Sequence, residues 1–118
     1  YHEVDVGVPV GFWRSVGHSH NGFAFECFVD EVAQAAGVDP FEWRRARLGG
    51  DPRLRAVLEL AARESGWGGA LPRGSGRGIA CMESYGTRVA LVAEVRVVEG
   101  EIDVRRITCA VDCGQVVH

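Results

Sequence analysis

The feature that most constrains the fold is a predicted β-hairpin whose strands cover residues 88–98 and 101–113. Val and Ile alternate there with charged residues, which is the pattern of strands with one buried face. Glu99-Gly100 joins the strands, and a two-residue turn with Gly in second position fixes their register. That register predicts five cross-strand pairs: Val97 with Ile102, Val95 with Val104, Arg96 with Asp103, Glu94 with Arg105, and Val92 with Ile107. We therefore expect a half-exposed tip and a base that is covered on both faces by helices or by further sheet.

Three amphipathic helices are predicted before the hairpin. The first covers residues 23–36, where apolar residues recur at helical spacing. The second and third, 40–48 and 52–65, each begin with Asp-Pro, an N-cap residue followed by Pro in the first helical position. A glycine follows each of the three. The side chains expected to face the core are Phe25, Phe28, Val29, Val32 and Ala36, then Trp43 and Leu48, then Leu54, Val57, Leu58 and Ala61, whereas Arg44, Arg45 and Arg47 are expected to point partly outward.

These elements divide the chain into a helical part and a β-rich part of one domain. Residues 1–65 hold a loop and the helices, and residues 1–11 within them read as an extended arm or edge strand. Residues 66–78 contain six glycines and a proline and are expected to be a mobile linker. The β-rich part, residues 79–118, opens with a short strand at 79–84. The predicted class is α+β, with about three helices packed on a small, mainly antiparallel sheet.

Composition narrows the class of protein. The 118 residues suffice for one domain with its own core. A net charge of -3 argues against a nucleic-acid partner, because phosphates demand a basic surface. The apolar runs are too short to span a membrane. Because the chain begins at Tyr1 and stops at His118 directly after a strand-like run, we expect that it was cut from a longer protein, of cytoplasmic or periplasmic location.

The cysteines are expected to be buried thiols that act as small hydrophobic residues. The sequence holds four of them, and none forms a Cys-x-x-Cys pair. On a straight strand, Cys109 and Cys113 would lie roughly 13 Å apart. That separation is too large for a shared metal ion or a disulfide bond.

The loop at residues 12–22 is the richest candidate site in the sequence for binding or catalysis. Arg14 follows two bulky aromatic residues there, and the loop leads into a helix N-terminus, whose free N–H groups favour anions. The sequence thus suggests a site for an anion or cofactor. The alternative is a polar helix-entry loop that its aromatic residues anchor to the core. His18 and His20 would point the same way in an extended loop, but no third ligand lies near them, so hydrogen-bonded histidines are favoured over a metal site.

Other polar residues give weaker signals. Glu26, Asp30 and Glu31 lie near the predicted start of the first helix, where they are expected to complement its dipole and aid solubility. Glu83 and Tyr85 either line a pocket or form a polar strand end before a turn, and the second interpretation is favoured. No phosphate-loop ending and no Ser-His-Asp or Cys-His set is recognisable, so no catalytic residue is predicted within the chain.

Three stretches, in this order, resemble one protein family. They are VPVGFWRSVGHSHNGFAFECFVDEV continuing into AQAAGVDPFEWRRARL (8–48), GRGIACME (76–83) and VALVAEVRVVEGEIDVRRITCAVDCGQVVH (89–118). The first is similar to a family segment in which an aromatic-Arg-small loop enters a helix with an acidic cluster. The third is similar to the family's Ala-Glu-Val strand and Val-Asp-Cys-Gly run. The family is the xanthine oxidase family of molybdopterin-binding large subunits, and its isoquinoline 1-oxidoreductase beta and aldehyde dehydrogenase types are the most similar.

The resemblance implies an oxidoreductase that hydroxylates an N-heterocycle or an aldehyde at a molybdenum centre. Molybdopterin, in bacteria usually the cytosine dinucleotide form, would hold the metal. Electrons would leave through [2Fe–2S] clusters on a separate small subunit. The resemblance also implies that Trp13, Arg14 and Ser15 bind the cofactor, with positive charge from Arg14 and hydrogen-bond donors from its backbone.

This sequence also departs from the family pattern. Ser15 stands where many members have Gly after the Arg, and the family's Gly-Gln-Gly cofactor loop and its catalytic Glu in a C-terminal Gly-Glu motif are absent. We therefore expect the chain alone to be inactive and without cofactor. Two alternatives remain: a stand-alone interaction module whose Arg14 loop binds a partner or small anion, and a structural domain that forms a homodimer through the 101–116 strand or residues 1–8.

Overall fold

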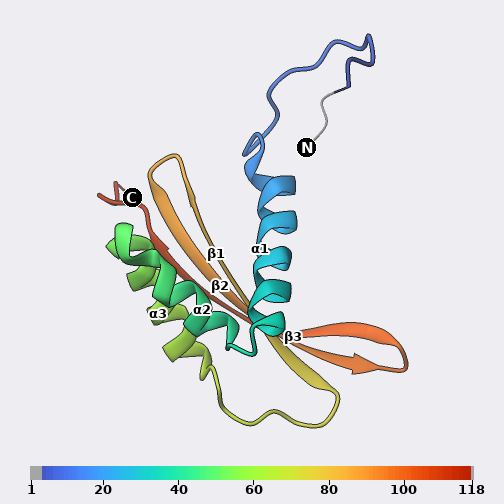
Figure 1. Cartoon of the computed structure of the whole chain (residues 1–118), viewed down its shortest axis with the longest axis vertical. Coiled ribbons are helices and arrows are strands. Elements are labelled where there is room, and N and C mark those ends of the chain that lie inside the picture. Colours follow the sequence, from blue (N-terminus) through green and yellow to red (C-terminus); the bar gives the residue numbers. More distant parts are fainter. Residues whose placement is uncertain (1–3, 118) are drawn as a thin grey trace.

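The sequence folds into three helices and a three-stranded sheet in a computed structural model that describes residues 4–117 (Figure 1). In chain order the elements are α1 (His18–Ala35), α2 (Pro40–Arg47), the 3-10 turn η1 (Leu48–Gly50), α3 (Pro52–Ser65), β1 (Ser75–Ser84), β2 (Thr87–Val98) and β3 (Glu101–Asp112). The strands are antiparallel, in the order β1-β2-β3. The α+β class and the long hairpin are confirmed. No helix among residues 4–117 is both long and apolar enough to cross a bilayer.

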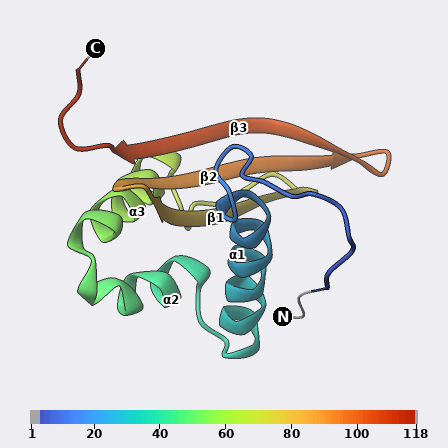
Figure 2. The ribbon, with the colours of Figure 1, turned by 90° about the horizontal axis from the view of Figure 1, so that it is seen from above.

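The core lies between α3 and one face of the sheet (Figure 2). The stripe predicted for the third helix is confirmed, and it meets small and branched residues of all three strands. Leu58 is among the fully buried side chains of this layer. The buried apolar residues are Leu54, Val57, Leu58, Ala61 and Ala62 from α3, with Ile79, Ala90, Val92 and Ala110 from the sheet.

The predicted caps of α2 and α3 are also confirmed. The Asp39 carboxylate accepts hydrogen bonds from the backbone N–H groups of Phe41 at 2.9 Å and Glu42 at 3.1 Å. Asp51 accepts one from the Leu54 N–H at 3.0 Å. Gly66 ends α3 in the left-handed conformation, with φ of 70°, a region that a glycine adopts without steric cost. These short-range signals therefore set both helix boundaries.

The prediction for the first helix was wrong at its start and on its buried side. The helix begins at His18, within the predicted loop, rather than at residue 23. Its buried residues are Gly22 and Ala33, whereas Phe25 and Phe28 are exposed. The reason is that α1 approaches β1 at Gly22, which has no side chain. A Cβ added at Gly22 would lie 2.2 Å from the Met82 methyl carbon. Within residues 4–117, the aromatic side of α1 has no covering layer.

The hairpin register was predicted correctly at the tip and wrongly at the base. Arg96 pairs with Asp103 and Val95 with Val104, as expected. A β-bulge then shifts the ladder, so that Glu94 pairs with Arg106 rather than Arg105, and Val92 with Thr108 rather than Ile107. The turn itself follows the prediction, because Glu99 and Gly100 both have positive φ, 52° and 87°, as a type I′ turn requires.

The bulge brings polar residues of β3 onto the face that α3 covers. Arg106 there donates a hydrogen bond to the Ser65 carbonyl oxygen at the end of α3. The apolar residues of the base consequently lie on the opposite face, where Leu91 and Ile107 are exposed. The expectation that the base is covered on both faces is therefore wrong for the described residues.

The glycine-rich connection is shorter than predicted. Strand β1 begins at Ser75 instead of residue 79, since the backbone N–H of Val97 donates to the Gly74 carbonyl at 2.8 Å and the ladder continues from there. Arg77 donates to the carbonyl oxygens of Gly66 at 2.7 Å and Gly69 at 3.2 Å. The loop is thus held against the strand that follows it.

The N-terminal arm forms no strand in residues 4–11. Of the two forms expected for residues 1–11, an extended arm or an edge strand, the structure has the arm in residues 4–11, and residues 1–3 lie outside the described part. β3 pairs only with β2, so within residues 4–117 its outer edge has no partner strand. Homodimer formation through this edge stays a prediction.

An ion pair joins the start of α3 to the end of β3, and we expect it to make the stability of the fold depend on pH in acid. Arg53 donates to both carboxylate oxygens of Asp112, at 2.7 Å each. These hydrogen bonds, with one from the Gly114 N–H, hold the pKa of Asp112 well below its usual range. Because the folded-state pKa is lowered, the pair stabilises the fold above pH ~4, and this stability is lost as pH falls toward the lowered pKa.

We expect Asp112→Asn to lower the melting temperature at pH 6 and to flatten its fall between pH 4 and 2, measured by circular dichroism. Arg53→Gln should do the same, and the double variant should add little to either, because both changes remove one interaction. Unchanged acid sensitivity in Asp112→Asn would contradict this assignment.

Candidate functional site

The three predicted cofactor-binding residues, Trp13, Arg14 and Ser15, lie together on one turn directly before α1. The Val16 N–H donates to the Trp13 carbonyl at 2.9 Å, and the His18 N–H to the Ser15 carbonyl at 2.8 Å. Ser15 and Val16 both have positive φ, 48° and 49°. This conformation is unusual for residues other than Gly and marks a strained backbone.

The turn presents positive charge to solvent. Among residues 4–117, Arg14 has no hydrogen-bond or ion-pair partner, and Trp13 is 83% exposed. No side chain caps the start of α1, and its first turn holds no acidic residue, so backbone N–H groups there can receive an anion. These groups surround an open hollow of about 870 Å³, which residues 11–17 and 19–21 line.

The two histidines do not form a pair. His18 and His20 lie in the first turn of α1, where residues two apart point to opposite sides of the helix. The expectation that they point the same way is wrong, because the helix begins earlier than predicted. The His18 ring instead packs edge-on against Tyr85, 5.7 Å between centroids. No group of three His, Cys, Asp or Glu within the described range could hold a metal ion.

Arg44 fixes the position of α1 relative to α2. It was expected to point partly outward, but it is only 4% exposed. Its guanidinium donates to Glu26 Oε2 at 3.0 Å, to Asp30 Oδ1 at 2.7 Å and to the Glu26 carbonyl at 3.0 Å. Glu26 and Asp30, predicted to be surface residues at a helix start, are therefore the partners of a buried cation.

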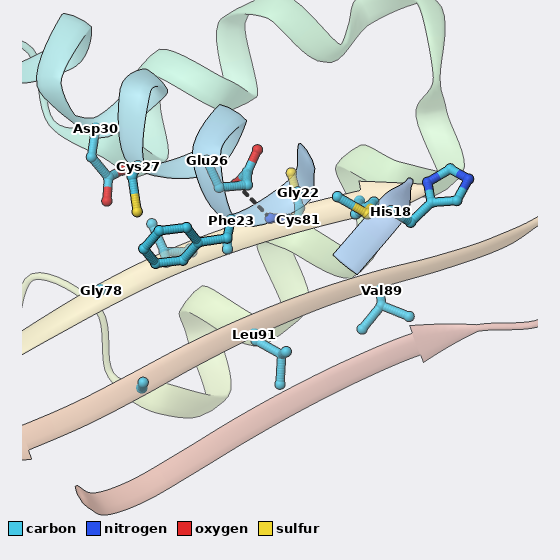
Figure 3. A pocket seen from close by; sticks show the side chains of 14 residues that line it. His18, Gly22, Phe23, Glu26, Cys27, Asp30, Gly78, Cys81, Val89 and Leu91 are labelled. Carbon is cyan, nitrogen blue, oxygen red and sulfur yellow. Dashed lines mark hydrogen bonds between the residues drawn. The ribbon is translucent and has the colours of Figure 1, made fainter. Parts of the chain in front are cut away.

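The Glu26 carboxylate also connects α1 to the sheet. Its Oε2 accepts a hydrogen bond from the Cys81 N–H at 2.9 Å, on the outer edge of β1 (Figure 3). Burial beside this carboxylate raises the pKa of the Cys81 thiol to about 12. Cys81 is partly buried, as a small hydrophobic residue would be, but Cys27, Cys109 and Cys113 are exposed, contrary to the prediction.

An apolar pocket of about 410 Å³ lies between α1 and the sheet, on the face opposite α3. Phe23 of α1 lies over β1 there, and Val89 and Leu91 of β2 complete the apolar lining (Figure 3). The sequence did not predict this pocket, because its lining comes from three elements, and the lining residues of α1 include His18 and Gly22, expected in a loop, and Glu26 and Asp30, expected at the surface. The glycine at position 22 is a sequence signal that could have placed α1 close to the sheet, because a residue without a side chain permits the close approach to Met82.

Glu83 and Tyr85 form the turn after β1, in line with the favoured interpretation. Glu83 Oε1 accepts a hydrogen bond from the Gly86 N–H at 2.6 Å, and Tyr85 is exposed with φ of 51°. Tyr85 also borders a hollow beside His18, Phe25 and Met82.

Comparison with known proteins gives two relatives. The chain is 36% identical to the beta subunit of isoquinoline 1-oxidoreductase from Brevundimonas diminuta over 118 aligned positions, which cover 92% of this chain and 15% of that protein. It is 40% identical over 60 residues to one of the subunits of nicotinate dehydrogenase from Pseudomonas putida, covering 51% of this chain and 5% of that protein. The chain thus spans a small part of the length of each. No protein-family model matches it, and no solved structure matches it.

Proposed function

We propose that this chain, which belongs to the xanthine oxidase family of molybdopterin-binding large subunits, is part of the cofactor-binding subunit of a molybdenum hydroxylase that oxidises an N-heterocycle. The observation that carries the proposal is the 36% identity over 92% of the chain. Isoquinoline and nicotinate, named in the two relatives, are both nitrogen heterocycles, which favours that substrate class over aldehydes.

The turn that holds Trp13, Arg14 and Ser15, which we call the Arg14 turn, is the part of this chain that we assign to the cofactor. Molybdopterin would supply the metal centre that exchanges oxygen and electrons with the substrate. Its phosphate groups, and the oxygen ligands of the metal, are anionic or strongly accepting. Arg14, which has no partner among residues 4–117, and the uncapped N–H groups of α1 provide the charge and donors that such groups require.

The conformation of Ser15 is consistent with this assignment. Many members of the family have Gly after the Arg, and Ser15 adopts φ of 48°, which Gly adopts without strain. Ser therefore stands where many members have Gly, but the backbone at Ser15 keeps a conformation that suits Gly. The Trp13 ring beside it would shield the bound group from water.

The chain alone is proposed to be inactive. It spans 15% of the isoquinoline 1-oxidoreductase relative, and it lacks the family's Gly-Gln-Gly loop and its Gly-Glu base. The remaining cofactor contacts would come from the rest of the subunit, and electrons would pass to a [2Fe–2S] partner. The cytosine dinucleotide form of the cofactor is part of the same proposal.

Arg14→Ala tests the assignment in the complete subunit, co-expressed with its small iron–sulfur partner. We expect at least about tenfold weaker retention of molybdenum and pterin, because a charge-assisted hydrogen bond contributes about 1.5–3 kcal/mol. Metal analysis after dialysis and the fluorescence of released pterin measure this retention.

Arg73→Ala is the matched control, because Arg73 is exposed and no interaction of it is found among residues 4–117. Full cofactor retention by Arg14→Ala would show that Arg14 does not bind the cofactor. A folded wild-type subunit without molybdenum would refute the proposed function, and an interaction module that binds an anion through Arg14 would then be favoured.

A further inference from the structure

The face of the sheet opposite α3 is an uninterrupted apolar surface, which we call the open face. In register, Leu91 lies beside Cys109, Val95 beside Val104, and Val97 beside Ile102. Every paired position of the hairpin on this face is apolar or Cys. Six large side chains on it are 41–71% exposed, namely Leu91, Val97, Ile102, Val104, Ile107 and Val111.

The open face continues into the pocket beneath α1. Leu91 belongs to both, and Phe23 of α1 closes the far side (Figure 3). Together they form one apolar region that extends from the pocket along the hairpin. Monomeric soluble proteins rarely expose so large a contiguous apolar patch, so the region marks a surface that is covered in the working protein.

The character of this surface favours a covering layer from the same polypeptide. Interfaces between separate proteins have a polar rim around an apolar centre, whereas the hairpin side of the open face is apolar from its base to its tip. Sheets with such a face usually pack against a second layer of the same domain. The isoquinoline 1-oxidoreductase relative is long enough to contain such a layer, since this chain aligns with only 15% of that protein.

A second copy of this chain would leave other apolar residues uncovered. Phe25 and Phe28 on α1 are exposed as well, and they lie on the side of that helix opposite Phe23, at about 100° per residue. One symmetric contact through the open face would not reach them. A long polypeptide that wraps both sides of α1 would.

We propose that the open face is an internal surface of the complete subunit, covered by a second layer from the remainder of the same polypeptide. The proposal rests on the proposed function, which places this chain within a longer subunit. The open face then forms one half of a hydrophobic core, and a distant part of the same polypeptide forms the other half. Side chains of that second layer fill the pocket beneath α1.

Native cysteines report directly on this surface. Cys109 lies on the open face and is exposed in the 118-residue chain, whereas Cys81 is partly buried. Maleimide labelling of the complete, folded subunit, read by mass spectrometry, should leave Cys109 at least about tenfold less reactive than in denaturant. A Val98→Cys variant supplies an exposed control on the opposite face of the same hairpin, and it should label at full rate.

Fast labelling of Cys109 in a complete subunit that carries molybdenum would overturn this inference and leave the proposed function intact. A folded subunit without cofactor would refute the proposed function, whatever the labelling. In the 118-residue chain, rapid labelling of Cys109 supports the inference. Protection there that increases with protein concentration, together with a dimeric mass, would assign the open face to a second copy instead.

Discussion

Arg44→Ala is expected to lower the free energy of unfolding by about 3–5 kcal/mol, because it breaks a buried ion pair. Arg44 is 4% exposed, and its removal would leave the carboxylate of Glu26, itself 12% exposed, without its cation. The direct hydrogen bonds between α2 and α1 would be lost, and the unpaired carboxylate would remain at the junction with β1, where it accepts the Cys81 N–H. Urea denaturation followed by circular dichroism measures the change.

Arg45→Ala is the matched control for this prediction. Arg45 pairs with Glu42 at 2.7 Å, but both side chains are more than 40% exposed, and exposed pairs contribute about 0–1 kcal/mol. Equal losses in the two variants would show that burial of the Arg44 network is not what stabilises this junction. Arg44→Lys should fall between them, because an ammonium cannot reproduce the planar, forked hydrogen bonds of the guanidinium.

Leu58→Ala is expected to cost about 2–5 kcal/mol, because it leaves a cavity at the centre of the core. Leu58 is fully buried between α3 and the sheet. Leu60→Ala removes the same atoms from the same helix, but Leu60 is 37% exposed, so the expected loss is below about 1 kcal/mol. Thermal and urea unfolding of both variants give the comparison, and similar losses would contradict the core described here.

Short-range chemistry determined what the sequence could predict. Asp39, Asp51 and Gly66 act within four residues of themselves, and the helix boundaries that they predict are confirmed. The turn at Glu99 and Gly100 is similarly local, and the register of the hairpin tip follows from it. The stripe of α3 was predicted correctly because that helix packs on the sheet along one side.

Contacts between distant residues account for what the sequence did not predict. The burial of Arg44 depends on Glu26, 18 positions away, and nothing in α2 alone distinguishes Arg44 from Arg45. The bulge near Glu94 adds one residue to β3 without any glycine to mark it. At the candidate site, the loop that holds Trp13, Arg14 and Ser15 was predicted from its own residues, and the family resemblance singled out these three. The pocket beneath α1, by contrast, requires three elements to come together.

The two edges of the sheet differ in how readily they can pair with a further strand. On the β1 side, the Glu26 carboxylate accepts the Cys81 N–H, and α1 lies where another strand would pair. On the β3 side, the backbone groups of the outer edge meet no strand within residues 4–117. An added strand, from this polypeptide or from another, would meet α1 near Cys81 beside β1 and would meet no such obstacle among residues 4–117 beside β3. The sheet can therefore be extended more readily beyond β3 than beyond β1.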